Sequence, residues 1–251
     1  MKTNSYMFER INKMYLSKSE LENKKKHLTN ENKEKILSYK DIHKGERCFI
    51  IGASPSLAQL DLTKLNDEYT FCVNRGYKLK EKGLKHSTYY AFADKDLVEN
   101  DRVMDYFPDE FCNKFFVYAG LNFPDDKYNT VYFTKSIMKN KIFTDNLTQD
   151  LTEGYSIIHH AIQIAYYMGF QEMYLAGVDL DFLNVKGHIY KEFNSEIQRQ
   201  INMSVKSQSV MRKYIAYASD YIWQHGKMIY NVSPLNTIDF MPKIKYEELF
   251  K

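Results

Sequence analysis

Short apolar runs that each stop at a glycine or a polar residue recur along this chain from residue 47 to its end. Runs of this kind are typical of strands in a parallel sheet, because both faces of such a sheet are buried. The predicted strands are residues 48–51, 70–73, 88–92, 115–118, 131–133, 172–179 and 227–231. No other feature of the chain restricts its fold as strongly.

Helices are predicted between the later strands. From Tyr155 to Met168 apolar residues recur at three- and four-residue spacing, and Gly169 supplies a C-terminal stop. A long helix is predicted from about residue 205 to residue 224. Because helices and strands alternate, the expected fold class is α/β, with a doubly wound, mainly parallel, Rossmann-like sheet.

The N-terminal residues have a different character. Residues 6–38 predict one helix, because Leu16, Leu21, Leu28 and Ile36 are set among Lys, Glu and Asn with no Pro or Gly to interrupt them. We therefore divide the 251 residues into a helical arm over 1–40 and one Rossmann-like domain over 41–251. The arm is expected to pack on the domain, and a partner-binding or membrane-surface helix is the alternative.

Composition excludes several classes of protein. A net charge of +3 does not support generic nucleic-acid binding. Cys48, Cys72 and Cys112 lack the paired spacing of a zinc site or a disulfide framework, which favours a reducing compartment. The chain has no apolar stretch of roughly twenty residues and no signal-peptide core. A cytoplasmic location is expected, with contact to the inner face of the membrane and homo-oligomerisation left open.

The turn after the first strand, Gly52-Ala53-Ser54-Pro55-Ser56-Leu57, is the predicted phosphate-binding segment. In parallel sheets ligands bind beyond the carboxyl ends of the strands, where loops and helix N-termini meet. Gly52 allows a sharp turn, Ser54 can cap the next helix, and Ser56 can offer a hydroxyl to a phosphate. The segment is neither a Walker motif nor G-x-G-x-x-G, so an ordinary capped helix is the alternative.

Several short motifs follow one another in a specific order. They are a strand with G-x-x-P-S-L, a strand ending in Asn, T-x-G opening a helix, and a strand of the form Y-L-x-G-x-D. This order resembles the bacterial sialyltransferases of glycosyltransferase family 42. It also resembles the related 6-hydroxymethylpterin diphosphokinase-like domains found in surface-polysaccharide clusters. The likeness covers about residues 47–240 and implies a glycosyltransferase A-like fold and a CMP-activated sugar donor.

The resemblance also implies where the donor binds. Its phosphate would lie on the turn that begins at Gly52, and its ribose or phosphate near Asn74. Tyr190 falls where the family carries a tyrosine that helps the leaving phosphate, and a hydroxyl donor there would stabilise developing negative charge. The donor-binding residues so implied are Gly52, Ala53, Ser54, Ser56, Asn74, Arg75, Thr152, Glu153, Gly154 and Gly177.

The chain departs from the family pattern at several positions. Ala53 stands where the family has Asn, Glu153 where it has Ser, and Asp150 where it has an Arg, which disfavours CMP-sialic acid itself. Residues 202–214 contain no histidine to serve as the family's general base.

Another base must therefore be found. His188 is the candidate, since an imidazole can accept a proton at neutral pH. Asp94, Asp179 and Asp181 are the alternative bases, although each could instead cap a helix or a turn. The expected catalytic residues are His188, Tyr190, Asp179 and Asp94. His159 and His160 lie on an apolar helix, where at least one is expected in the core and neither as a ligand.

Three functions remain open from the sequence. The leading one is an inverting, metal-independent glycosyltransferase that binds a nucleotide-sugar donor and a glycan or lipid-linked glycan acceptor. No cofactor or metal ligand is assigned, although Asp179-Leu180-Asp181 has the D-x-D form of a divalent-cation site. The alternatives are a 6-hydroxymethylpterin diphosphokinase-like pyrophosphoryl transferase, which would need magnesium and ATP, and a non-catalytic nucleotide-binding scaffold.

Overall fold

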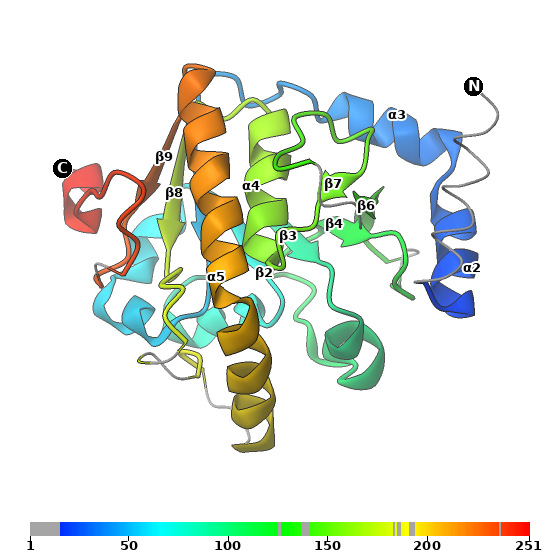
Figure 1. Cartoon of the computed structure of the whole chain (residues 1–251), viewed down its shortest axis with the longest axis horizontal. Coiled ribbons are helices and arrows are strands. Elements are labelled where there is room, and N and C mark those ends of the chain that lie inside the picture. Colours follow the sequence, from blue (N-terminus) through cyan, green and yellow to red (C-terminus); the bar gives the residue numbers. More distant parts are fainter. Residues whose placement is uncertain are drawn as a thin grey trace.

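A single parallel sheet of seven strands forms the centre of the molecule (Figure 1). The computed structural model describes residues 16–124, 127–136, 141–182, 184, 187–190, 194–235 and 237–251, with only the backbone for 194–206. The sheet has the order β5-β4-β3-β2-β1-β8-β9, and every neighbouring pair is parallel. Its strands are β1 Arg47–Ile51, β2 Tyr69–Val73, β3 Tyr89–Phe92, β4 Lys114–Tyr118, β5 Asn129–Phe133, β8 Glu172–Ala176 and β9 Met228–Asn231.

The predicted α/β class and all seven predicted strands are confirmed. Most boundaries agree within one or two residues, and the largest difference is at β8, where the run predicted to Asp179 ends as a strand at Ala176. Gly177 then adopts a left-handed conformation, with φ of 64°. A two-stranded sheet of β6 (Lys135–Ser136) and β7 (Leu151–Thr152) was not predicted, since strands of two residues leave no periodicity to detect.

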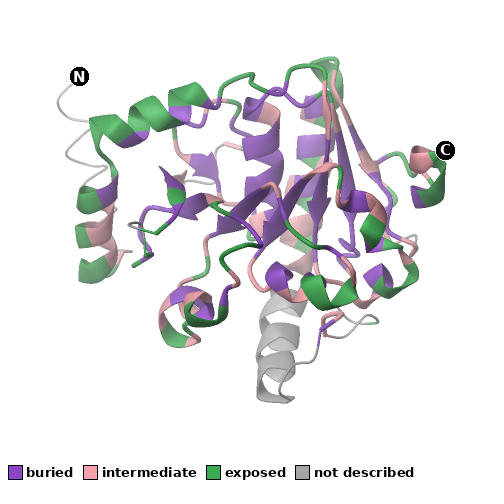
Figure 2. Ribbon diagram, turned by 180° about the vertical axis from the view of Figure 1, so that it is seen from behind, coloured by how far each residue is buried: buried purple, intermediate pink, exposed green. Residues whose placement is uncertain are grey.

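Helices cover one face of the sheet, and short helical turns cover the other (Figures 1 and 2). α4 (Ile157–Tyr167) packs on β1, β2 and β3, and α5 (Asn194–Gln224) lies beside it and contacts β9. α5 begins eleven residues earlier than the predicted residue 205. On the opposite face Phe49 stacks against Phe250 of the C-terminal turn. No helix within the described ranges is long and apolar enough to cross a bilayer.

α4 shows why this segment becomes a buried helix. The hydroxyl of Ser156 accepts a hydrogen bond from the backbone N–H of Ile158 at 3.2 Å, which caps the first turn. At the other end the N–H of Gly169 donates to Tyr166 and that of Phe170 to Ala165, the pattern of a glycine-terminated helix. Because β8 starts only a few residues later, the N-terminus of α4 lies at the carboxyl edge of the sheet.

The N-terminal arm consists of two helices within the described residues, so the prediction of one unbroken helix is wrong. α2 (Lys18–His27) and α3 (Asn30–Ser38) are separated at Leu28. Thr29 causes the break, because its hydroxyl accepts the N–H of Asn32 at 3.1 Å and so starts a new helix. Residues 6–15 of the predicted helix lie outside the described residues.

Side chains of the arm cover the free edge of β5. The Asn32 amide donates to the Tyr132 carbonyl at 2.8 Å, and its oxygen accepts the Tyr132 N–H at 2.7 Å. Both backbone groups of Tyr132, which face away from the sheet at this edge strand, are thereby paired. His27 stacks on the Tyr132 ring with 3.8 Å between centroids. α2 then reaches the segments that follow β4 and β3, where Asn23 bonds the Gly120 carbonyl and Lys95 bonds Ser17.

Candidate active site at the carboxyl edge of the sheet

The predicted turn lies at the point where the strand order reverses. From β1 the chain adds β2, β3, β4 and β5 on one side of the sheet. The later strands β8 and β9 are added on the other side of β1. Ligands of doubly wound sheets bind at such a switch point. The two strand ends are tied together, since Gly52 N–H donates to Ala176 at 2.8 Å and Ser54 N–H donates to Gly177 at 3.1 Å.

Both serine hydroxyls of the turn donate to the carboxylate of Asp179. Ser54 Oγ bonds Oδ2, Ser56 Oγ bonds Oδ1 at 3.0 Å, and Asp179 is only 3% exposed. The prediction that Ser54 caps a helix is wrong, because its hydroxyl makes no capping bond to the short 3-10 helix Pro55–Gln59. A hydroxyl has one proton, so in this arrangement neither serine can also donate to a phosphate. Phosphate contacts from this turn would have to come from its backbone N–H groups.

Asp179 is held by residues that the sequence did not mark. The Thr237 hydroxyl donates to the Asp179 carbonyl at 2.5 Å, and the Ser233 hydroxyl accepts the N–H of Val178 at 3.1 Å. Leu180 adopts a left-handed φ of 49°, which is strained for a leucine. Ser233 follows β9, so the polar-strand-end pattern used for the other strands could have identified it.

The two carboxylates of the D-x-D segment do not face one ligand. Asp179 accepts from the two serines, whereas both oxygens of Asp181 accept from the Asn184 amide, at 3.1 and 2.9 Å. Among the described residues no group of three or more His, Cys, Asp or Glu side chains could hold a metal ion. This arrangement gives no support to a cation bound through both aspartates.

The segment that carries His188 and Tyr190 lies against the turn. The N–H of Ile189 donates to the carbonyl of Ala53 at 2.9 Å. The His188 and Tyr190 rings stack, with centroids 5.0 Å apart and planes 13° apart, and Tyr190 is 8% exposed. Lys78 Nζ lies 5.0 Å from the centre of the Tyr190 ring. The structure therefore brings both predicted residues to the turn that begins at Gly52, and it places a lysine beside them.

Asn74, at the end of β2, has the features of a ligand contact. It is one of few non-glycine residues with a left-handed φ, here 52°, and its side-chain Oδ1 is buried without a hydrogen-bond donor from the described residues. Strained backbone and unsatisfied polar atoms concentrate at functional sites. The Tyr90 hydroxyl holds this backbone by donating to the Asn74 carbonyl at 2.9 Å. The neighbouring Arg75 pairs with Asp101 at 2.8 Å.

Asp94 follows β3 and is exposed. Its Oδ1 accepts the N–H groups of Asp96 at 2.9 Å and Leu97 at 3.5 Å, which is the capping role that the sequence left open for it. Its other carboxylate oxygen accepts no hydrogen bond from the described residues. A capping role therefore leaves one oxygen of Asp94 directed to solvent or substrate.

The segment before α4 is mostly structural. Thr152 is buried, and its hydroxyl lies 3.2 Å from that of Thr144. Glu153 pairs with Lys135 at 3.3 Å. Gly154 and Tyr155 both adopt left-handed φ values, 55° and 56°, and Tyr155 is exposed. Of the predicted donor-binding residues in this segment, Glu153 and Gly154 lie just before the N-terminus of α4, whereas the Thr152 side chain is packed in the interior.

His159 and His160 are both core residues, where at least one was expected to be. Both are completely or almost completely buried on α4, and burial lowers the pKa of each imidazole to about 3. His159 Nδ1 lies 3.2 Å from the Thr152 carbonyl, whereas neither ring nitrogen of His160 has a hydrogen-bond partner among the described residues. These neutral rings are unsuited to acid–base chemistry at neutral pH.

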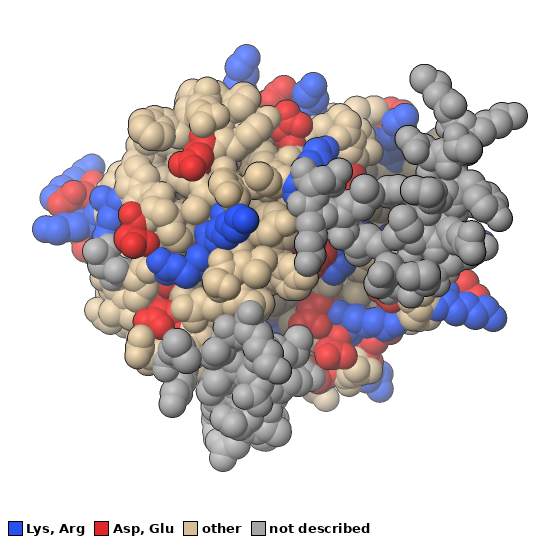
Figure 3. Space-filling model, viewed as in Figure 1, with Lys and Arg blue, Asp and Glu red and all other residues tan. Residues whose placement is uncertain are grey.

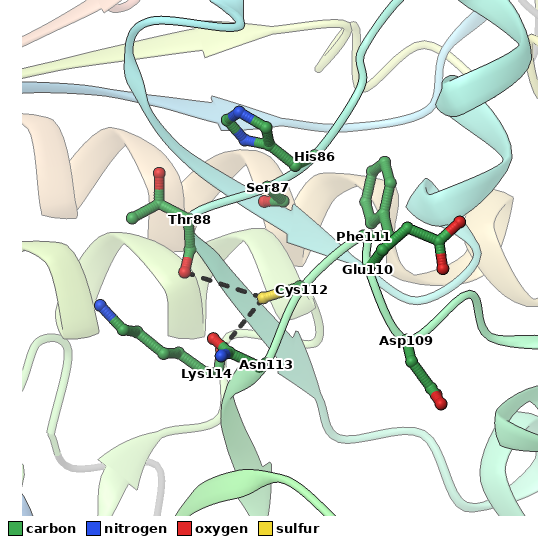
Figure 4. A pocket seen from close by; sticks show the side chains of 9 residues that line it. All are labelled: His86, Ser87, Thr88, Asp109, Glu110, Phe111, Cys112, Asn113 and Lys114. Carbon is green, nitrogen blue, oxygen red and sulfur yellow. Dashed lines mark hydrogen bonds between the residues drawn. The ribbon is translucent and has the colours of Figure 1, made fainter.

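Two hollows of the molecule lie away from this edge. One of about 350 Å³ is at the amino ends of β3 and β4, where Cys112 Sγ contacts the carbonyls of Thr88 and Lys114 (Figure 4). Burial raises the pKa of the Cys112 thiol to about 12, so it is not a nucleophile. Another of about 300 Å³ lies between the arm and β5. On the face drawn in Figure 3, basic side chains alternate with acidic ones over the residues that are coloured.

Comparison with known proteins identifies a family and a fold. A family model described as 6-hydroxymethylpterin diphosphokinase MptE-like matches residues 18–185. No curated protein matches the chain in sequence.

Solved structures share the architecture. The Maf glycosyltransferase of Magnetospirillum magneticum AMB-1 is similar with a TM-score of 0.52 and 17% identity, over 87% of this chain and 38% of that one. This chain thus spans well under half of that protein. The sialyltransferase CstII of Campylobacter jejuni, in complex with cytidine-5'-monophosphate, is similar with a TM-score of 0.51 and 18% identity, over 80% of this chain and 85% of that one. At these identities the likeness shows a common fold.

Proposed function

Because the chain belongs to the MptE-like family of 6-hydroxymethylpterin diphosphokinase-like proteins and shares its fold with CstII, we propose that it is a glycosyltransferase. It transfers a sugar from a nucleotide-activated, CMP-linked donor to a glycan acceptor. The observation that carries the proposal is the contact of the Tyr190 segment with the turn at the switch point, through Ile189 N–H and the Ala53 carbonyl. That contact sets a phenol beside the predicted phosphate turn.

The proposed reaction is a direct displacement. The acceptor hydroxyl attacks the anomeric carbon and passes its proton to a base, while the bond from that carbon to the phosphate oxygen breaks and the nucleotide leaves with the electron pair. The anomeric centre is inverted. The Tyr190 hydroxyl and the backbone N–H groups of the turn donate to the leaving phosphate, whose negative charge grows in the transition state.

The geometry favours Asp94 over His188 as the base. In a direct displacement the nucleophile and the leaving group lie on opposite sides of the anomeric carbon, and inverting glycosidases keep their two carboxyl groups about 6.5 to 9.5 Å apart for this reason. His188 stacks on Tyr190 and so serves the leaving-group side. Asp94 follows β3, and β3 lies two strand spacings, roughly 10 Å, from β1. Asp179 is excluded from a direct role by its two serine contacts.

Replacing Asp94 with asparagine is expected to lower kcat by about 10²- to 10⁴-fold, the usual contribution of a general base. Asparagine caps a helical turn as well as aspartate, so the bonds to Asp96 and Leu97 and the melting temperature should be kept. His188→Asn is the matched comparison and should retain far more activity. A normal kcat in Asp94→Asn together with a collapsed kcat in His188→Asn would return the base to His188.

Binding of a panel of nucleotides tests the proposed function itself. Ligands that bind the folded chain raise its melting temperature by mass action, and we expect CMP to raise it more than UMP, GMP or AMP. Release of CMP from CMP-sugars should then continue in EDTA. No shift and no release with CMP-, UDP- or GDP-sugars would contradict a glycosyltransferase and favour the scaffold.

The family description supports a second candidate, pyrophosphoryl transfer from ATP to a 6-hydroxymethylpterin. That reaction would use magnesium, whereas the carboxylates of Asp179 and Asp181 are directed to separate partners. Formation of a pterin diphosphate that requires magnesium and stops in EDTA would establish it. The same assays therefore separate the two candidates.

A further inference from the structure

We propose that Lys78 is the cation that binds the phosphate of the donor nucleotide, a role that rests on the proposed function and that no sequence motif indicates. Its Nζ lies 5.0 Å from the centre of the Tyr190 ring. Tyr190 belongs to the segment that is bonded to the turn through Ala53. The ammonium group is therefore on the side of the site where the leaving phosphate is expected.

The backbone of Lys78 is held rigidly at the sheet edge. It lies in the 3-10 helix Gly76–Lys82, and its N–H donates to the Arg75 carbonyl at 3.1 Å. The buried Tyr90 hydroxyl accepts the N–H of Tyr77 at 2.8 Å and donates to Asn74, so one phenol ties this helix to the end of β2. Burial raises the pKa of Tyr90 well above its usual value, which keeps that hydroxyl protonated.

Charge pairing distinguishes Lys78 from its neighbours. Three basic residues near the same strand ends form ion pairs: Arg75 pairs with Asp101, Lys95 with Glu99, and Lys135 with Glu153. Lys80, on the same short helix, pairs with Glu110. No carboxylate of the described chain makes an ion pair with Lys78. Its positive charge is available to a ligand.

The turn also needs such a cation. The buried carboxylate of Asp179 lies beneath it and would repel a phosphate, and the serine hydroxyls donate to that carboxylate and not outward. A lysine amine supplies three N–H donors and a full charge. Lys78 would therefore offset Asp179 when the nucleotide binds and stabilise the charge that develops as it leaves.

The test compares CMP with cytidine, which differ by the phosphate alone. In Lys78→Gln the affinity for CMP is expected to fall by about ten- to a hundredfold, the range of a charge-assisted hydrogen bond, while the affinity for cytidine stays within about twofold. Lys78→Arg should keep most of the CMP affinity. Lys82→Gln, an exposed lysine of the same helix, is the control and should bind both ligands as the unchanged chain does.

Each other outcome has a defined meaning. Equal CMP affinity in Lys78→Gln and the unchanged chain overturns the proposal, as does an equal loss for CMP and cytidine, which would indicate a structural role. If the unchanged chain prefers another nucleotide, that monophosphate and its nucleoside replace the pair. If it binds none, the proposed function fails together with this one, whereas a failure confined to Lys78 leaves the proposed function standing.

Discussion

A Gly52→Ala chain is expected to lose about 3 to 5 kcal/mol of folding stability, the range of the most damaging core substitutions. A Cβ at position 52 would lie well inside 3.0 Å of the Gly177 carbonyl oxygen, and backbone cannot move aside as a flexible side chain can. The same two strand ends are joined by the Gly52 and Ser54 N–H bonds, so separating them also costs hydrogen bonds. The denaturant midpoint of unfolding measures the loss.

Two other glycines separate this steric effect from backbone strain. Gly45 and Gly226 have left-handed φ values of 86° and 73°, and a Cβ there meets nothing within 4 Å. Alanine at either position should cost only about 1 to 2 kcal/mol, the cost of left-handed backbone for an L-residue. A Gly52→Ala chain as stable as Gly226→Ala would mean that the switch point is more open than the structure has it.

Acidification below pH 6.5 is expected to destabilise the fold more than carboxylates alone would explain. In the unfolded chain the pKa of His159 and of His160 is the ordinary value of about 6.5, whereas burial lowers the pKa of each to about 3 in the folded chain. Between these values the unfolded state binds more protons. Their stabilising contribution is therefore complete above pH 6.5 and is lost as the pH falls towards 3, by up to about 1.4 kcal/mol per histidine per pH unit.

The His160→Phe variant isolates this effect. The centroid of the His160 ring lies 5.4 Å from that of Phe133, and neither ring nitrogen has a hydrogen-bond partner among the described residues. Phenylalanine therefore removes two buried, unsatisfied polar atoms. We expect higher stability at pH 7 and about half the acid slope between pH 6.5 and 5, measured by urea unfolding. His160→Leu is the second variant, in case the phenylalanine ring is too large for the site. The control is His86→Gln, which replaces an exposed histidine and should leave the slope unchanged. An unaltered slope in both His160 variants would assign the acid sensitivity elsewhere.

The strands were predictable because burial on both faces leaves a local trace. β1, β2 and β3 are almost wholly buried, and each is followed by the small or polar residue that a strand end requires. α4 was predictable because its apolar residues recur at three- and four-residue spacing and Gly169 marks its end. The break in the arm was readable in principle at Thr29, a capping residue, but the absence of Pro and Gly concealed it. β6 and β7 were too short to produce a pattern.

The candidate site was predictable only in part. The polar ends of parallel strands meet at one edge whatever their order, so Gly52, Asn74 and Asp179 could be assigned to a common region. The acceptor to which each hydroxyl donates depends on distances between residues that are far apart in the chain. Ser54 therefore appeared to be a helix cap and bonds Asp179 instead. Lys78 and Thr237 belong to no motif, and only their neighbours in space distinguish them.

The amino-acid sequence by itself determined the class of fold, the presence of the seven main strands and the edge at which their polar ends meet, because hydrophobic periodicity and strand ends are local properties. The tertiary structure decided the strand order, the pairing of Ser54 and Ser56 with Asp179, and the stacking of His188 on Tyr190. It also decided which basic side chains of the described residues form ion pairs, such as Arg75 with Asp101 and Lys80 with Glu110. These are properties of pairs of residues, and pairwise distance and burial exist only once the chain has folded.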